Sequence, residues 1–207
     1  MSIEPQHPNG ELPASSAETR ANARRSSTAQ ISSIVALAVS VLALATGAYQ
    51  TRLMQVQARA SVWPSVAIGA SYFGSGDNAG FTWFIDNNGV GPARIQTVSV
   101  SFDGKPKRNW SEVFVALSMD PNEKENTVIY NIGGKVLPPN VNRETAIQAI
   151  KVVKPEVAKR FFEAMDRFAI SICYCSVYDE CWLAHWPKRV IDPVAQCTVQ
   201  NSVEFEQ

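Results

Sequence analysis

The sequence lacks both the charge imbalance and the short motifs that mark many nucleic-acid-binding proteins and enzymes. Lysine plus arginine and aspartate plus glutamate number 19 each, and no basic stretch is interleaved with aromatic residues. This balance argues against a nucleic-acid partner. No nucleophile elbow, phosphate-binding loop, dinucleotide fingerprint or zinc-protease motif is present. We therefore expect no cofactor, no catalytic residue and a protein that is not an enzyme.

Histidine is scarce, because the chain has only two. His7 lies in a polar N-terminal stretch, and His185 stands between Trp182 and Trp186, where a packed structural histidine is the common outcome. The adjacent carboxylates Asp179 and Glu180 fall in a strand or turn, where neighbouring side chains point apart. We therefore interpret this carboxylate pair as part of a solvated turn.

One long apolar run is present, and it predicts a transmembrane helix over residues 30–50. Residues 31–49 carry no charge, and a helix of this length spans about 28 Å, close to the hydrocarbon thickness of a bilayer. A cleaved signal peptide is the alternative, because residues 43–45 and 46–48 resemble cleavage sites. The polar leader and the apolar run are both longer than in a typical signal peptide. We therefore expect residues 31–49 to contact the lipid bilayer.

The flanks of the apolar run predict the rest of the domain organisation. Residues 1–29 have almost no large apolar side chains, which is typical of a disordered tail. The helix should continue as a stalk over residues 51–63 until Pro64 ends it, and residues 64–207 should form a β-rich globular domain. Three arginines precede the span and two follow it, which favours an N-terminus inside the cytoplasm and a C-terminal domain outside it.

Two stripes on this helix suggest a homodimer. Small residues recur inside the span and apolar residues recur along the stalk, at spacings of three and four. The two stripes are Ala36, Ser40, Ala43 and Gly47, followed by Tyr49, Leu53, Val56, Ala60 and Trp63. Membrane helices are rich in alanine in any case, and two heptads are too few to identify a coiled coil by themselves.

The C-terminal part reads as short strands separated by turns. Alternating β-branched and aromatic segments predict strands over residues 65–73, 81–86, 95–102, 127–132, 144–153, 168–178, 181–186 and 197–205. Helices are expected over residues 111–117, with Ser111 as the cap, and over residues 154–166. This pattern predicts a mainly β fold, an antiparallel β-sandwich-like domain with one or two short helices.

All four cysteines follow residue 172, and they leave three interpretations open. In an oxidising compartment Cys173, Cys175, Cys181 and Cys197 would form two disulfides. Cys173 and Cys175 share one strand face, so each should reach Cys181 or Cys197, and Cys175 to Cys181 is the shortest hairpin option. In another interpretation the cysteines are buried free thiols that pack as small apolar side chains.

The remaining interpretation of the cysteines is a zinc site. Cys173, Cys175, Cys181 and His185 could supply four ligands, with Cys197 in reserve. The paired C-x-x-C spacing of common structural zinc sites is missing, so we predict no metal site as the main outcome.

Four stretches together resemble a set of uncharacterised bacterial proteins. They are WP at 63–64, NNGVGPA at 87–93, FDGKP at 102–106 and CYCSVYDECW at 173–182. That set is similar to single-pass, signal-anchored membrane proteins with a C-terminal immunoglobulin-like or β-sandwich domain. The resemblance implies a bacterial inner (cytoplasmic) membrane location, and it transfers no activity and no catalytic residue.

We expect from these features a membrane-anchored, non-catalytic interaction or scaffolding module with a protein partner. A thiol- or metal-dependent redox protein that uses the cysteine cluster is an alternative, and so is a small-ligand sensor domain.

Overall fold

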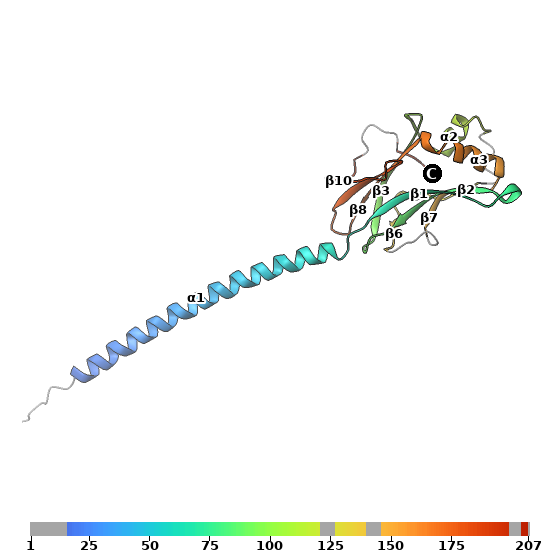
Figure 1. Ribbon diagram of the computed structural model, residues 1–207. Helices are drawn as coiled ribbons and strands as arrows, with labels where there is room; N and C mark the ends of the chain where they lie inside the picture. The colour runs from blue at the N-terminus through green and yellow to red at the C-terminus, as the bar shows by residue number, and fades with distance from the viewer. Residues whose placement is uncertain (1–15, 121–126, 140–145, 199–203, 207) are drawn as a thin grey trace, which may run out of the picture. The chain divides into compact units, whose positions relative to one another are not determined.

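The computed structural model describes residues 16–120, 127–139, 146–198 and 204–206, with side chains from residue 30 onward (Figure 1). The chain divides into two compact units, Met1–Gln55 and Val56–Gln207, and each is described by itself. Of the tail predicted over residues 1–29, residues 1–15 lie outside the described part of the chain.

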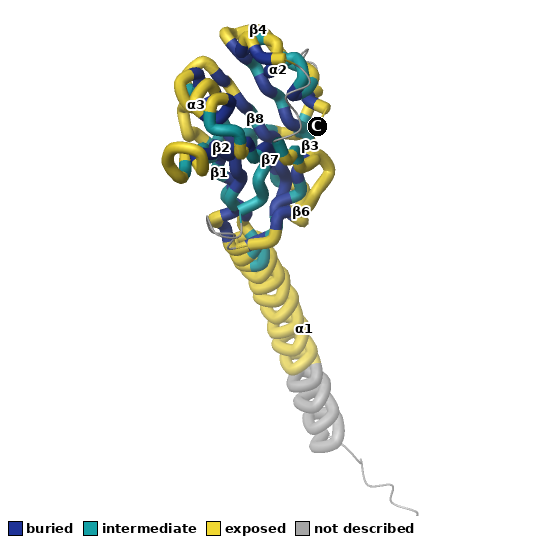
Figure 2. The backbone as a smooth tube through the Cα atoms, turned by 90° about the vertical axis from the view of Figure 1, so that its right-hand side faces the viewer, coloured by how far each residue is buried: buried dark blue, intermediate teal, exposed yellow. Residues whose placement is uncertain are grey.

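Helix α1 spans Ser16–Ala60 and contains the apolar run. It begins inside the range predicted as a tail, because residues 16–29 include alanine, glutamate and arginine, which favour helices. Its segment from Gln30 onward is long and apolar enough to cross a membrane. Leu37 and Leu44 are 70% and 74% exposed, so these side chains are not part of a protein core. Figure 2 colours most of the described length of α1 as exposed. The helix ends at Ala60, three residues before the predicted end of the stalk.

Two antiparallel sheets form the C-terminal unit, which confirms the predicted β-sandwich-like fold. The first has the strand order β1-β2-β7-β5, and the second has the order β10-β9-β8-β3-β4 with β6 also paired to β3. The strands of the first sheet are β1 (Val66–Phe73), β2 (Gly80–Asn87), β7 (Ile147–Val152) and β5 (Thr127–Ile129). Those of the second are β10 (Ile191–Val194), β9 (Cys181–Trp186), β8 (Phe168–Cys175), β3 (Ala93–Phe102), β4 (Lys105–Lys107) and β6 (Val136–Leu137).

An aromatic core fills the space between the sheets and the helices. Helix α3 (Pro155–Glu163) places Phe161 against Phe81 of β2, with ring centroids 5.6 Å apart. The ring of Trp83 packs edge-on against the rings of Phe168 and Trp186, with ring centroids 5.8 Å and 4.9 Å apart. The 3₁₀ turns η1 (Gly76–Asn78) and η3 (Met165–Arg167) connect β1 to β2 and α3 to β8. Burial of these large rings stabilises the contact between layers.

Two further sequence predictions require correction. The short helix α2 (Trp110–Ala116) is capped by Asn109, whose Oδ1 accepts a hydrogen bond from the Glu112 N–H at 3.0 Å, and not by Ser111. The strand predicted over 197–205 is not formed at residues 197–198 or at 204–205, and residues 199–203 lie outside the described part. The last strand is instead β10, where Pro193 weakens the sequence signal.

Candidate functional site

The β8–β9 hairpin carries three of the four cysteines, Cys173, Cys175 and Cys181, together with the one described histidine, His185. In its register Cys175 lies opposite Cys181, Cys173 opposite Leu183, and Ser171 opposite His185. The alternate residues of β8, such as Ile172, face the aromatic core. The cysteines and the histidine therefore lie on the outer face of the second sheet.

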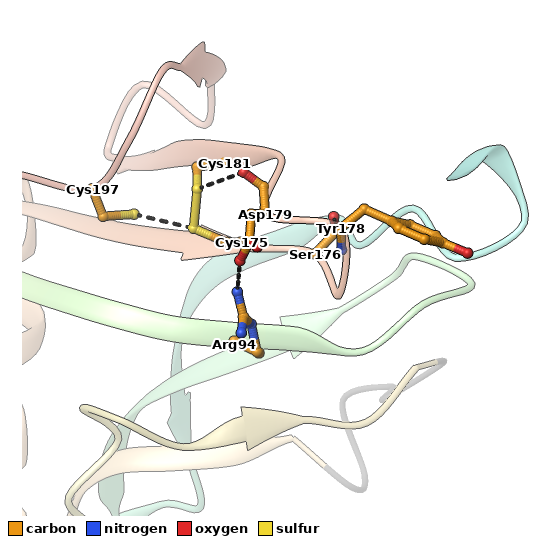
Figure 3. Close-up of polar contacts among 7 residues, drawn as sticks. All are labelled: Arg94, Cys175, Ser176, Tyr178, Asp179, Cys181 and Cys197. Atoms are coloured by element: carbon orange, nitrogen blue, oxygen red, sulfur yellow. Dashed lines mark hydrogen bonds and ion pairs between the residues drawn. A yellow bond between two sulfur atoms is a disulfide. The ribbon is translucent and has the colours of Figure 1, made fainter. Parts of the chain in front are cut away.

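Both disulfides of the chain lie on this outer face. Cys173 bonds to Cys197 and Cys175 bonds to Cys181, with Cα–Cα distances of 5.7 Å and 4.0 Å. The second of these spans the hairpin turn, where the sequence indicates the shortest pairing. Cys197 belongs to the segment after β10, so the first disulfide ties this segment to β8. Figure 3 shows Cys175 joined to Cys181, with Cys197 close beside them.

The sulfur atoms form a tight group, and His185 is not part of it. Sγ of Cys175 lies 3.7 Å from Sγ of Cys197, and these two sulfurs and that of Cys181 all lie within 4.8 Å of one another. His185 Nδ1 lies 3.0 Å from Ser171 Oγ, and its Nε2 lies 3.4 Å from Asp192 Oδ2. The structure therefore does not gather the ligand set Cys173, Cys175, Cys181 and His185, and it places the thiols in disulfides.

Two ion pairs connect the turn that closes the hairpin to other parts of the chain. Asp179 pairs with Arg94 of β3 (Figure 3). Glu180 Oε1 lies 3.4 Å from a guanidinium nitrogen of Arg59, at the end of α1. Both pairs are exposed, so each adds little stability. They do give the two carboxylates structural partners, in a turn whose Ser176 N–H donates to the Glu180 carbonyl at 2.8 Å. The pair Asp179–Glu180 is a structural turn and is not arranged as a catalytic dyad.

A groove runs along the free edge of β1. Its β1 wall consists of Val66, Ala67, Ile68, Gly69 and Ala70, and its volume is about 240 Å³. The opposite wall comes from the β9–β10 hairpin and includes His185, Arg189 and Ile191.

The start of β1 is tied to the second sheet through Tyr174. Its hydroxyl oxygen accepts a hydrogen bond from the Val66 N–H at 3.3 Å. Burial raises the pKa of this tyrosine, and the hydrogen bond from Val66 partly opposes the shift. The ring of Trp182 stacks on that of Tyr174, with ring centroids 5.8 Å apart, and Trp63 packs edge-on against Trp182, with ring centroids 6.5 Å apart. The hydrogen bond from Val66 and the contacts among these three rings hold the start of β1 at one end of the groove.

Arg189 at the other wall is held in an uncommon backbone conformation. Its φ is 54°, in the left-handed region, and its guanidinium lies 5.2 Å from the ring centroid of Trp186. Such a conformation costs on the order of 1 kcal/mol for a residue with a side chain. The Arg189 N–H donates to the His185 carbonyl at 3.0 Å, which holds the turn. Sequence reasoning missed this residue, because only the fold brings it to the edge of β1.

Comparison with protein families, with curated proteins and with solved structures gives no match.

Proposed function

We propose that this protein is a single-span protein of a bacterial inner membrane that holds its β domain outside the cytoplasm. There the domain binds a protein partner and catalyses no reaction. The apolar segment of α1 supports the anchor, because its length and composition suit a bilayer. The two disulfides support the location, because such bonds form and persist in oxidising compartments.

The observation that carries the binding role is the open edge of β1 beside a groove. β1 is 8 residues long and forms one outer edge of its sheet. An open edge is a template for pairing with another chain, so proteins usually shorten, charge or cover it. β1 contains neither a charged residue nor a proline. An anchored domain with such an edge is suited to hold a partner near the membrane.

Site-specific photo-crosslinking in the native membrane tests this proposal. A photoreactive amino acid replaces Val190 at the groove, which is 45% exposed, and in a matched control it replaces Val115 on α2, which is 57% exposed. We expect a discrete adduct with another envelope protein from position 190 at native expression, and none from position 115. Absence of an adduct from position 190, with normal protein abundance, would contradict the binding role. An adduct of twice the chain's mass would identify a homodimer instead.

A further inference from the structure

We propose that the free edge of β1 binds an extended strand of another protein, which carries a carboxylate that pairs with Arg189. This inference rests on the proposed binding function and names its partner class. The partner adds its main chain to the first sheet next to β1. Its acidic side chain, or its C-terminal carboxylate, reaches the wall formed by the β9–β10 hairpin.

The register of β1 and β2 determines which main-chain groups the partner meets. The Asn88 N–H donates to the Ser65 carbonyl at 2.8 Å, so these opposite residues form a hydrogen-bonded pair. In an antiparallel ladder such pairs alternate with pairs whose groups point away from each other. Ala67, Gly69 and Ser71 therefore bond to β2, whereas Val66, Ile68, Ala70 and Tyr72 direct their N–H and C=O groups toward the free edge.

The contact of Val66 supports this assignment independently. Its N–H donates to the Tyr174 hydroxyl, which lies on the second sheet and not on β2. Ile68, Ala70 and Tyr72 continue the same side of the strand over about 14 Å. Among the strands that the structure describes, only β2 pairs with β1. An edge of alternating donors and acceptors with this spacing matches an extended polypeptide.

The other outer edges of the two sheets are less suited to strand addition. β5 and β4 have only 3 residues each and β6 has 2, while β10 has 4; β4 and β10 also contain a proline, Pro106 and Pro193. Proline removes a main-chain donor and blunts an edge. β1 is the longest of these edge strands, with 8 residues, and it contains the small residues Ala67, Gly69, Ala70 and Ser71. The partner is therefore expected at β1.

The charge on the groove wall identifies the acidic character of the partner. Lys188 and Arg189 are consecutive and exposed, and within the described ranges no carboxylate lies within ion-pair distance of either. His185, also on this wall, faces Asp192. Asp86 lines the groove as well, but it already has an interaction within the protein. A carboxylate on the incoming strand would pair with Arg189, which offers bidentate geometry.

A library of random linear dodecapeptides on phage, selected on the full chain in detergent micelles, provides the probe. We expect enriched peptides with alternating β-branched or aromatic residues and at least one aspartate or glutamate. A synthetic peptide with one of the enriched sequences should slow amide hydrogen exchange at Ile68, Ala70 and Tyr72 of the protein. The amides of Gly69 and Ser71 already bond to β2, so their exchange should change little.

A proline substitution tests the edge directly. Ala70→Pro removes one N–H that faces the partner and leaves the bonds to β2 in place, so peptide affinity should fall about tenfold. Ala70→Ser keeps this N–H and should bind like the wild type. Arg189→Gln should weaken an acidic peptide several-fold and should not affect the same peptide with its carboxylate replaced by an amide. Arg189→Gln lies on the surface, so it tests the proposal even if Ala70→Pro misfolds.

The outcomes separate this inference from the proposed function. Peptides that bind Ala70→Pro as well as the wild type, or that protect amides elsewhere, overturn strand addition at β1 and leave a binding module. Failure to enrich any peptide, while photo-crosslinked adducts form in membranes, does the same. Exchange protection that rises with chain concentration and needs no peptide would assign the edge to a second copy and overturn the acidic partner. If no peptide is enriched and no adduct forms from position 190, both proposals are overturned.

Discussion

The side-chain amide of Asn87 donates a hydrogen bond to the backbone carbonyl of Gly91, with the nitrogen 2.8 Å from the oxygen. Asn87 is fully buried, and its Oδ1 accepts hydrogen bonds from the N–H groups of Ser65 and Gly89, each at 3.1 Å. One side chain thus connects the segment before β1 with the turn after β2. This junction fixes the start of the strand whose free edge we propose as the binding site.

Replacement of Asn87 by alanine should destabilise the domain. The substitution leaves the buried N–H of Gly89, the partly buried N–H of Ser65 and the Gly91 carbonyl without their partner. Each buried unsatisfied group costs roughly 1–3 kcal/mol. We expect a loss of at least about 2 kcal/mol in urea unfolding of the full chain in detergent, followed by tryptophan fluorescence. Asn88→Ala is the control, because Asn88 is exposed and its substitution should change stability by less than about 0.5 kcal/mol. Equal effects at both positions would contradict the role of Asn87.

Gly91 should not tolerate a side chain. A Cβ there would lie 1.8 Å from the carbonyl oxygen of Val62, so the backbone before β1 would have to move. We expect Gly91→Ala to cost about 2 kcal/mol or more in the same unfolding measurement. Gly133→Ala is the matched control, because the nearest atom to its added Cβ is a flexible side chain at 3.5 Å. A nearly neutral Gly91→Ala would show that the contact with Val62 is looser than described.

The two disulfides should contribute unequally to stability. Their sequence separations are 24 for Cys173–Cys197 and 6 for Cys175–Cys181. Loop-closure entropy then predicts losses of about 3.5 and about 2.4 kcal/mol when each pair is replaced by serine. Urea unfolding of the two double variants under non-reducing conditions measures the difference. A larger loss for the shorter loop would show that native-state packing around the hairpin outweighs chain entropy.

The pKa of Asp103 should depend on Arg167. A side-chain hydrogen bond from Arg167 is the largest cause that holds the pKa of Asp103 below its ordinary value of 3.8, with Nε 2.9 Å from Oδ1. The lowered pKa means that this pair favours the folded state above pH 3.8, and that the contribution is lost as pH falls through the lowered value. Carboxyl NMR titration of the Arg167→Gln variant should show a rise toward 3.8.

Lys105→Gln provides the control for this titration, because Lys105 acts on Asp103 only through a weaker Coulombic interaction. Its effect on the pKa of Asp103 should be in the same direction and smaller. An unchanged pKa in Arg167→Gln would mean that the pair is dissociated in solution.

Local sequence patterns predicted the hairpin of β8 and β9 well. Residues 181–186 coincide with β9, and Cys173 and Cys175 share a face as strand alternation requires. These features depend on side-chain type and on a period of two, which a single segment carries by itself. The strand predicted over 144–153 also contains β7, where Ile150 and Val152 are buried in the core.

Non-local features could not be predicted in this way. The open edge of β1 depends on which strands lie next to it, and strand order is a property of the whole sheet. Arg189 comes to the groove only because β10 pairs with β9, and Pro193 hides that strand from a propensity argument. Asn109 was missed as a helix cap because Ser111 follows it closely and has similar capping chemistry.

The redox state of the four cysteines in living cells tests the anchored, extracytoplasmic domain most directly. Cells that express the full chain at native level are quenched in acid, and free thiols are blocked with N-ethylmaleimide under denaturing conditions. The sample is then reduced and labelled with a maleimide of high mass. We predict that all four cysteines are labelled only after reduction, because Cys173–Cys197 and Cys175–Cys181 form disulfides in the cell. Complete blocking before reduction would show free thiols, as in the cytoplasm, and would contradict the proposed location.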